Sequence, residues 1–292
     1  MKTSKTIRSY EALRNVVDGG YCIGCGLCAA TCSKGAVMTM TKFQTFQPLL
    51  KEDDVCAPDE WRSAEQVCPF TNAGPNEDEI AEMLYPTLDK DIRIGRYYAN
   101  YIGHVVDAGT RQKVSSGGLI TWILTQLLKS GEVDYVVHVK EASGKLLFAY
   151  DISESPQQIL AGAKSRYYPI ELSGVVNKLE SLPGKCVIVG LPCFIKGLRS
   201  LTSIRPDLND KVKYMVGLVC GHLKSAAFAD CFSWQLGVKP GEAKSVDFRH
   251  KYPDRSADDY GFSVSSASGE FHKRTGDLLG SNWGLNFFRY SA

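Results

Sequence analysis

The sequence predicts an α/β protein (α+β overall) in which a small cysteine-rich module precedes a larger domain with a mixed, partly parallel sheet. Two observations lead to this prediction. Six of the ten cysteines lie within the first 68 of the 292 residues. From residue 92 onward, short apolar runs of strand length alternate with segments of helical periodicity, which is typical of strands joined by crossover helices. A chain of this length is expected to form one large domain or two.

Composition narrows the classes of protein that fit. The chain is 44% hydrophobic and 23% charged, which is typical of a folded globular protein. Its formal net charge of +2 gives no indication of nucleic-acid binding through phosphates. It contains no apolar stretch long enough to cross a membrane, and its N-terminus lacks the apolar core of a signal peptide. We therefore expect a cytoplasmic protein whose thiols are reduced and available to metals, without a disulfide framework.

The expected boundary between the two parts lies between residues 91 and 92. Residues 51–91 carry twelve acidic and three basic side chains, so this segment is strongly acidic. Within it, the turn-rich residues 72–76 precede a helix-like segment at 77–85, which is followed by Pro86. This composition is typical of a connector. We therefore expect a module at 1–91 and an α/β domain at 92–292.

The elements of the larger domain follow from periodicity and turn residues. The expected strands lie at 96–102, 133–139, 145–151, 185–190 and 211–220, and a β-rich segment begins at 246. The expected helices lie at 117–130, 156–163, 174–182, 194–201 and 224–236. Gly131 ends the first of these helices, and Ser155 followed by Pro156 is a typical start for the second. The strand at 185–190 is apolar throughout, which predicts a fully buried strand.

The cysteine run near the N-terminus has the spacing of an iron–sulfur motif. The pattern C-x2-C-x2-C-x3-C is formed by Cys22, Cys25, Cys28 and Cys32. An iron–sulfur cube is bound at its corners, so several thiolates have to converge from one tight loop, and two-residue gaps allow this. Gly24 and Gly26 lie in these gaps and relieve crowding where the backbone wraps the cube.

The fourth ligand is expected from a remote cysteine. In bacterial ferredoxins the last cysteine of such a run commonly ligates a second cluster, and Cys68 followed by Pro69 supplies the remote Cys-Pro pair. The predicted ligands of one [4Fe-4S] cluster are therefore Cys22, Cys25, Cys28 and Cys68. A second cluster would use Cys32 and Cys56 with two ligands from elsewhere. Zinc and cysteines packed in a core are the alternatives, although zinc sites usually use two separate C-x2-C pairs.

Over essentially its whole length, the sequence resembles the beta subunits of coenzyme F420-reducing hydrogenases and related dehydrogenases. The resemblance rests on the head CIGCGLC…VCPF, on SSGG within residues 96–124, on AKSRYYPIEL, on VIVGLPCFIKGLRSL and on GLVCGHLKS. It implies a ferredoxin-like head with one or two [4Fe-4S] clusters, a bound FAD, and an organic two-electron substrate. That substrate is F420 in the namesake enzymes and a chlorophyll-pathway pigment in others. A flavin fits between the clusters and this substrate because it accepts single electrons and delivers electron pairs.

Three segments are the candidate flavin contacts, since no GxGxxG fingerprint occurs. SSGG precedes a helix, where backbone N–H groups suit a phosphate, and a plain helix cap is the alternative. GLPC follows the buried strand, where α/β sheets bind ligands, and a structural turn is the alternative. Lys164 and Arg166 would neutralise a pyrophosphate unless they are simply solvated. The candidate residues are Ser115, Ser116, Gly117, Gly118, Lys164, Arg166, Gly190, Pro192, Cys193 and Arg199; Cys193 also fits a redox thiol or a cluster ligand.

These features favour an iron–sulfur flavoprotein oxidoreductase that acts with a redox partner protein or subunit and a small-molecule electron acceptor. No motif distinguishes F420 from a pigment or another substrate. The alternative is a non-catalytic electron-transfer or adaptor subunit, with the acidic segment 52–91 as a docking face. Family members continue beyond a segment like residues 282–292 toward further cysteines, so the resemblance implies a chain truncated at its C-terminus.

Overall fold

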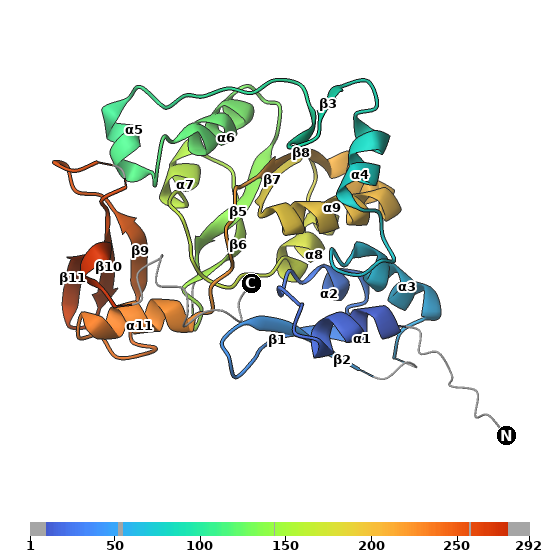
Figure 1. The fold of residues 1–292 in the computed structure, drawn as a ribbon, viewed down its shortest axis with the longest axis horizontal. Coiled ribbons are helices and arrows are strands. Elements are labelled where there is room, and N and C mark those ends of the chain that lie inside the picture. Colours follow the sequence, from blue (N-terminus) through green and yellow to red (C-terminus); the bar gives the residue numbers. More distant parts are fainter. Residues whose placement is uncertain (1–9, 52–54, 143, 257, 280–292) are drawn as a thin grey trace.

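A computed structural model describes residues 10–51, 55–142, 144–256 and 258–279. Along its longest axis, Figure 1 shows a cysteine-rich region at one end, a four-stranded sheet with its helices in the middle, and a small sheet with one helix at the other end. None of the helices in these ranges has the length and apolar character needed to span a bilayer. The residues at 282–292 that bear on truncation lie outside the described ranges.

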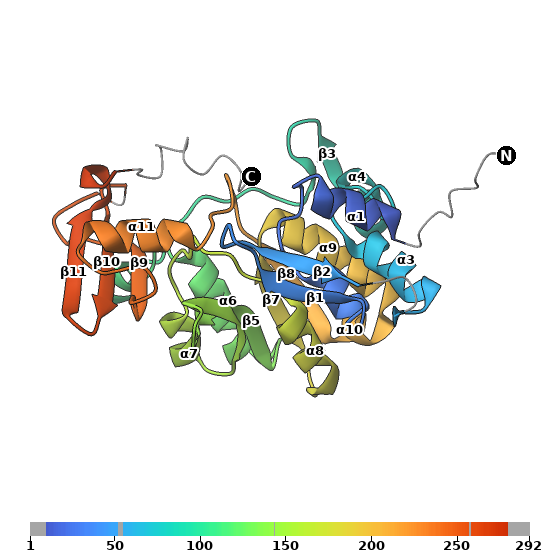
Figure 2. The same ribbon diagram turned by 90° about the horizontal axis from the view of Figure 1, so that it is seen from below.

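The cysteine-rich region combines three short helices with one hairpin. Its elements are α1 (Glu11–Asp18), α2 (Leu27–Thr31), β1 (Ala36–Met40), β2 (Phe46–Leu50) and α3 (Pro58–Val67). Trp61 on α3 is fully buried and packs against Tyr10, with ring centroids 4.2 Å apart. The tip of the β1–β2 hairpin lies near the start of helix α11 (Ala227–Gln235) (Figure 2). There the Ala226 N–H donates to the Gln44 carbonyl oxygen at 2.9 Å. That this region is ferredoxin-like stays a prediction.

The central sheet has the strand order β6–β5–β7–β8 and confirms the predicted mixed, partly parallel arrangement. Its strands are β5 (Tyr135–Glu141), β6 (Phe148–Ser153), β7 (Cys186–Gly190) and β8 (Val212–Gly217). β5 pairs antiparallel with β6, whereas β5, β7 and β8 run parallel. Every residue of β7 is buried, as its continuous apolar run predicts.

The predicted helices of this domain are all present. They are α6 (Leu119–Lys129), α7 (Pro156–Ala161), α8 (Ser173–Ser181), α9 (Pro192–Ile204) and α11 (Ala227–Gln235), and the structure adds the short α10 (Pro206–Lys211). Ser155 caps α7, since its side chain accepts from the Gln158 N–H, and Pro156 takes the first helical position. These local signals therefore predicted the start of α7 correctly.

After α3, the acidic segment forms a further helix and the first strand of a short hairpin. These elements are α4 (Glu77–Leu84) and β3 (Asp89–Asp91); β4 (Gly95–Tyr97) completes the hairpin beyond the segment, and α5 (Ala108–Lys113) follows before α6. α4 lies where the sequence predicts it. The prediction of a strand at 96–102 is wrong beyond residue 97, because no neighbouring strand among the described residues pairs with this apolar segment. Tyr98, Tyr101 and Ile102 are instead exposed.

The predicted β-rich segment is an antiparallel meander packed on α11. Its strands are β9 (Ser245–His250), β10 (Gly261–Ser266) and β11 (Gly269–Arg274), and the 3-10 turn η2 (Thr275–Asp277) follows. Phe248 on β9 stacks on Phe228 of α11 with centroids 5.8 Å apart. Because side chains alternate along a strand, this inward Phe248 turns Arg249 to the other face.

Part of the cysteine-rich region belongs to the hydrophobic core of the central sheet, whereas Tyr10, Trp61 and the residues around them form a separate small cluster. Leu27 and Val67 belong to the same buried cluster as Leu198 on α9. A Cβ at Gly197 would lie 2.4 Å from Leu27 Cδ1 and 3.0 Å from the Val67 carbonyl oxygen, so only glycine permits this approach. The boundary between residues 91 and 92 stays a prediction, because the two parts are packed together without a gap in the core.

Candidate functional site

Four thiols converge on one small cavity in the cysteine-rich region. The cavity is lined by Cys22, Cys25, Cys28, Cys68, Pro69 and Phe70, among others. Gly24 and Gly26 have φ angles of +70° and +80°, a left-handed conformation that glycine adopts without strain. A Cβ at Gly24 would lie 2.4 Å from the Phe46 carbonyl oxygen. The two predicted glycines therefore allow the loop to turn tightly around the cavity.

The environment of these thiols suits a bound metal group. Burial raises the pKa of all four thiols, to about 11 for Cys22, and the neighbouring thiols raise the pKa of Cys25 and Cys28 further. The Gly24 N–H points at Cys22 Sγ across 3.4 Å, and further backbone N–H groups face the other three sulfurs. Thiolates gathered this closely need a cation to offset their charge, so the residues present fit a metal cluster.

The separation of the sulfur atoms bears on the kind of metal group. Among the described residues, the one set of three or more ligand-type atoms lying mutually within 4.8 Å is Cys32, Cys56 and Glu60. No three of the four converging thiols therefore lie mutually within that distance. A tetrahedral zinc ion with Zn–S bonds of about 2.3 Å would hold its sulfurs roughly 3.8 Å apart. The wider spacing favours a cluster over a single zinc ion.

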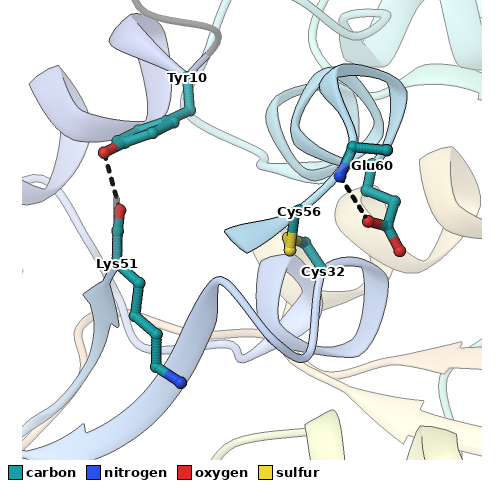
Figure 3. The surroundings of a disulfide bond; sticks show 6 residues. Tyr10, Cys32, Lys51, Cys56 and Glu60 are labelled. Atoms are coloured by element: carbon teal, nitrogen blue, oxygen red, sulfur yellow. Dashed lines mark hydrogen bonds between the residues drawn. A yellow bond between two sulfur atoms is a disulfide. The ribbon is translucent and has the colours of Figure 1, made fainter. Parts of the chain in front are cut away.

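Cys32 and Cys56 are paired with each other. The structure joins them in a disulfide between the end of α2 and the turn before α3, with Cα atoms 6.6 Å apart (Figure 3). The expectation that every thiol is reduced is therefore wrong for this pair, because packing of α2 on α3 brings the two cysteines within bonding reach. Their role as ligands of a second cluster stays a prediction, and it requires this bond to be reduced.

A cavity of about 850 Å³ lies where the ends of β7 and β8 meet the start of α6. This volume is within the range of small-molecule and cofactor sites. The carboxyl ends of parallel strands are where open α/β sheets bind ligands. The ring-bearing side chains along its wall are Tyr150, Tyr167, Tyr168, Tyr260, His138 and His222. The cavity can therefore hold a large ligand with a flat aromatic part.

The charge of this cavity is strongly positive. Its cationic residues are Lys164, Arg166, Lys224 and Arg249, and none of the described residues that line it is Asp or Glu. The Nε atoms of Arg166 and Arg249 are buried and have no hydrogen-bond partner among the described residues. Lys224 is 1% exposed, and this burial lowers its pKa to about 8. Donors arranged in this way fit the phosphates or carboxylates of an anionic ligand.

Two of the predicted segments meet at the mouth of the cavity. The Ser165 N–H donates to Ser115 Oγ at 2.6 Å, which joins the SSGG turn to the segment around Lys164. Lys164 has a φ of +92°, which is rare for a residue with a side chain. Its Nζ lies 2.9 Å from the Asp247 carboxylate and 3.1 Å from the Arg249 carbonyl oxygen. These contacts to β9 hold Lys164 in its strained conformation beside the cavity.

The structure separates the predicted cofactor contacts into two groups. Seven line the cavity: Ser115, Ser116, Gly117, Gly118, Lys164, Arg166 and Gly190. The other three, Pro192, Cys193 and Arg199, belong to α9 and are not part of the lining. Arg199 instead reaches α4, where its Nη2 lies 3.3 Å from the Tyr85 hydroxyl. Gly190, at the end of β7, therefore lies at the cavity, whereas these three residues of the following helix α9 do not line it.

Sequence reasoning missed several residues of the cavity. Arg249 was detectable, because Val246 and Phe248 alternate with polar residues and so predict that Arg249 faces away from the core. His138 gave no signal within its apolar strand. Its Nε2 pairs with Ser153 Oγ at 2.8 Å, and burial lowers the pKa of His138 to about 4.

Two residues that line the large cavity lie near the thiol site. Ile170 lines the cavity and, two residues later, the Leu172 N–H donates to the Cys25 carbonyl at 2.8 Å. Tyr150 also lines the cavity; burial raises its pKa first, and the nearby Cys193 and Cys25 thiols raise it further. A group bound at Cys25 would therefore lie near the part of the cavity that Tyr150 and Ile170 line.

A further pair of thiols lies at the ends of the parallel strands. Cys193 follows β7, and Cys220, which lines the cavity, follows β8. Burial raises the pKa of Cys193, and the neighbouring Cys220 adds to this rise. Two thiols cannot hold a four-iron cluster by themselves, so this pair would need two more ligands.

The larger domain matches the sequence profiles of a known protein family. Residues 100–177 match the sequence profile of the coenzyme F420 hydrogenase/dehydrogenase beta subunit N-terminal region, and residues 184–277 match that of the C terminus of the same subunit. The coenzyme F420-dependent sulfite reductase of Methanocaldococcus jannaschii is 26% identical over 222 aligned positions, which cover 71% of this chain and 32% of that protein. The chain therefore spans about a third of the length of this relative.

Among solved structures, a chain from the F420-reducing [NiFe] hydrogenase complex of Methanosarcina barkeri is similar. It shares 18% identity with a TM-score of 0.45, and the match covers 64% of each chain. The two profiles together contain every residue that lines the large cavity, whereas the cysteine-rich region lies outside both of them.

Proposed function

Because the chain belongs to the coenzyme F420 hydrogenase/dehydrogenase beta subunit family, we propose that it is an iron–sulfur flavoprotein oxidoreductase. In this proposal, electrons pass between a [4Fe-4S] cluster in the cysteine-rich region, an FAD in the large cavity, and an organic two-electron substrate. The sulfite reductase relative is named for coenzyme F420, which supports F420 as the substrate. The observation that carries the proposal is that the cavity residues Tyr150 and Ile170 lie near Cys25 of the thiol site.

The cysteine-rich region would hold the cluster. Its ligands would be Cys22, Cys25, Cys28 and Cys68, which converge on one cavity with sulfurs spaced too widely for zinc. Backbone N–H groups directed at these sulfurs stabilise the negative charge of the thiolates. Gly26 brings this loop against the start of α8, since a Cβ there would lie 3.0 Å from the Ser173 nitrogen.

The large cavity would hold the flavin. Arg166 and Arg249 supply buried donors that the described residues leave unpaired, and Lys164 is fixed beside them by Asp247. These cations bind the pyrophosphate, while the tyrosines along the wall contact the ring system. Gly118, with a φ of +82°, is the N-cap of α6, and the first residues of this helix also line the large cavity. The backbone N–H groups at this helix start would bind a phosphate of the flavin.

The two sites would form two successive steps of one electron path. When bound, a cluster carries single electrons and a flavin converts them into pairs. Tyr150 and Ile170 would lie between the two bound groups, and the Tyr150 hydroxyl is held by donating to the Val189 carbonyl oxygen at 2.9 Å. A redox partner is needed on the cluster side, because each two-electron reaction draws two electrons through the thiol site. Two carboxylates of the acidic segment are already paired within the chain and are less available to a docking partner than expected. Glu77 pairs with Lys196, and Glu82 pairs with Arg96.

The test is metal and flavin analysis of the anaerobically purified chain. We expect a brown protein with about four irons per chain and one releasable FAD. A colourless protein with stoichiometric zinc contradicts the cluster. A cluster-containing protein that binds no flavin contradicts the assignment of the cavity and favours the electron-transfer adaptor. The substrate is tested by reduction of added F420 with a chemical reductant of the cluster as electron source.

A further inference from the structure

We propose that Lys251 is a positioning residue of the flavin cavity, which holds the SSGG turn at residues 115–118 in the shape that receives a phosphate. The inference rests on the proposed function, because it takes FAD as the ligand of the large cavity. It goes beyond that function by giving a role to a residue that does not itself line the cavity. It is carried by the contacts of the Lys251 ammonium group, by the anchoring of its strand, and by the cations around it.

The Lys251 ammonium group joins the end of the β-meander to the turn before α6. Lys251 directly follows β9. Its Nζ donates to the carbonyl oxygen of Arg111, on α5, at 2.5 Å and to that of Ser116 at 3.3 Å. Between these two residues lies Val114, at which α5 ends. One charged side chain therefore fixes both ends of the segment that leads from α5 into the SSGG turn.

The SSGG turn is held by side chains and backbone from three separate segments. Ser115 Oγ accepts the Ser165 N–H at 2.6 Å, and the Gly117 carbonyl oxygen accepts the Val105 N–H at 2.8 Å. Lys251 supplies the third contact. All four residues of the turn line the large cavity. A turn has no continuous ladder of backbone hydrogen bonds, so its shape depends on such contacts.

Strand β9 is a firmly anchored support for Lys251. Phe248 is buried and packs in the aromatic core of the meander. On the side of the cavity, the Asp247 carboxylate lies 2.9 Å from Lys164 Nζ, and Arg249 lines the cavity itself. These contacts do not involve the Lys251 side chain. Removal of its ammonium group should therefore loosen the turn and leave β9 in place.

The charges around Lys251 favour an anion at this turn. Burial is the largest cause that lowers the pKa of Lys251. Three neighbouring cations lower the pKa further and one carboxylate opposes them; these groups are Lys164, Arg111, Arg249 and Asp247. A phosphate bound at the turn would offset the repulsion among the cations. Phosphate binding and the charged form of Lys251 therefore favour each other.

The first experiment needs no flavin. Hydrogen–deuterium exchange is followed by mass spectrometry in the flavin-depleted full chain, in peptides that cover residues 111–118 and, as the internal reference, the buried strand β7. Lys251→Met keeps an apolar stem but removes the charge and the donor. We expect exchange at 111–118 to become about tenfold faster with β7 unchanged, because two carbonyls lose a charged donor. Lys273→Met, at an exposed lysine of β11, is the matched control and should change neither peptide.

The second experiment separates the charge of Lys251 from its bulk. The affinity for FAD is measured by fluorescence titration of the unchanged chain, Lys251→Met, Lys251→Arg and Lys273→Met. We expect FAD to bind about tenfold more weakly to Lys251→Met. Arginine keeps the charge and presents several N–H donors, so Lys251→Arg should recover the affinity to within about threefold. Lys273→Met should bind FAD as the unchanged chain does.

Each remaining outcome contradicts a stated part of the proposal. Equal exchange at 111–118 in Lys251→Met and the unchanged chain means that Lys251 does not hold the turn. Faster exchange in β7 as well makes the effect a general unfolding. Faster exchange at the turn with unaltered FAD affinity, or equally weak binding in Lys251→Met and Lys251→Arg, overturns the positioning role. If the unchanged chain binds no FAD, the proposed function fails, and the exchange experiment alone decides whether Lys251 holds the turn.

Discussion

The thiol site and the large cavity differ in how the chain builds them. Three of the four thiols lie within residues 22–28, so one loop supplies most of that site. The cavity draws its lining from residues 103 to 260, and its cations come from three separate segments. A site on one loop needs only correct local geometry. A site assembled from distant segments needs the whole domain, and its residues are tied to the stability of that domain.

The largest expected effect tests how local the thiol site is. Cys28→Ser should reduce bound iron from about four per chain to below one, because a cube that loses one thiolate ligand becomes labile. Flavin content should fall much less, since Cys28 does not line the large cavity. The measurements are iron analysis and the visible spectrum. Cys231→Ser, in a half-buried cysteine of α11, is the control and should keep its iron. Equal iron loss in both variants would contradict the assignment.

The next effect concerns the brace between α2 and α3. The double variant Cys32→Ala, Cys56→Ala should lower the free energy of unfolding by about 3 kcal/mol under oxidising conditions, because the bond closes a loop with a sequence separation of 24 residues. Denaturation with urea measures this difference. It should disappear when both proteins are treated with a dithiol. A variant that unfolds at the same urea concentration as the oxidised unchanged chain would show that the bond contributes nothing to stability.

The same contrast explains how much could be predicted from sequence. Spacing was enough for the four thiols, because two-residue gaps and a remote Cys-Pro pair require a specific loop. Ser115 and Lys164 were predicted separately, and only the fold shows that their segments meet. The Cys32–Cys56 bond depends on the packing of α2 against α3, which no spacing rule contains.

Sequence patterns were least informative where the outcome depends on a tertiary contact. Residues 98–102 have the apolar composition of a strand but find no partner strand in the described part of the chain. Arg199 lies nine residues after the end of β7 and contacts Tyr85, which follows α4, so its role as a flavin contact stays a prediction. Whether a segment pairs as a strand, and whether a side chain reaches the edge of the sheet, both depend on contacts with residues that are remote in sequence.

The buried histidine of the cavity gives the third prediction. Burial, reinforced by Lys140, lowers the pKa of His138 to about 4, below its ordinary value of 6.5. The unfolded chain therefore binds a proton at this residue below pH 6.5, whereas the folded chain does so only near pH 4. The contribution of His138 to stability is complete above pH 6.5 and is lost as the pH falls toward 4, by up to about 3 kcal/mol.

Variants isolate this contribution from that of the carboxylates. The free energy of unfolding is measured between pH 7 and pH 4.5 for the unchanged chain, for His138→Asn and for His272→Asn. His272 is exposed on β11 and serves as the control. We expect the pH dependence to become shallower in His138→Asn alone. An equal slope in all three proteins would mean that His138 takes up its proton in the fold as readily as in the unfolded chain.

The smallest effect compares two arginines that differ in position. Arg249 lines the large cavity with a buried Nε that has no partner among the described residues, whereas Arg199 contacts Tyr85 on α4. Arg249→Gln should weaken FAD binding about tenfold, which corresponds to about 1.4 kcal/mol for one lost charge-assisted hydrogen bond. Arg199→Gln should leave FAD affinity unchanged within about twofold. Fluorescence titration of the flavin-depleted protein measures both affinities. If Arg199→Gln has the larger effect, the flavin binds along α9 and not in the cationic cavity.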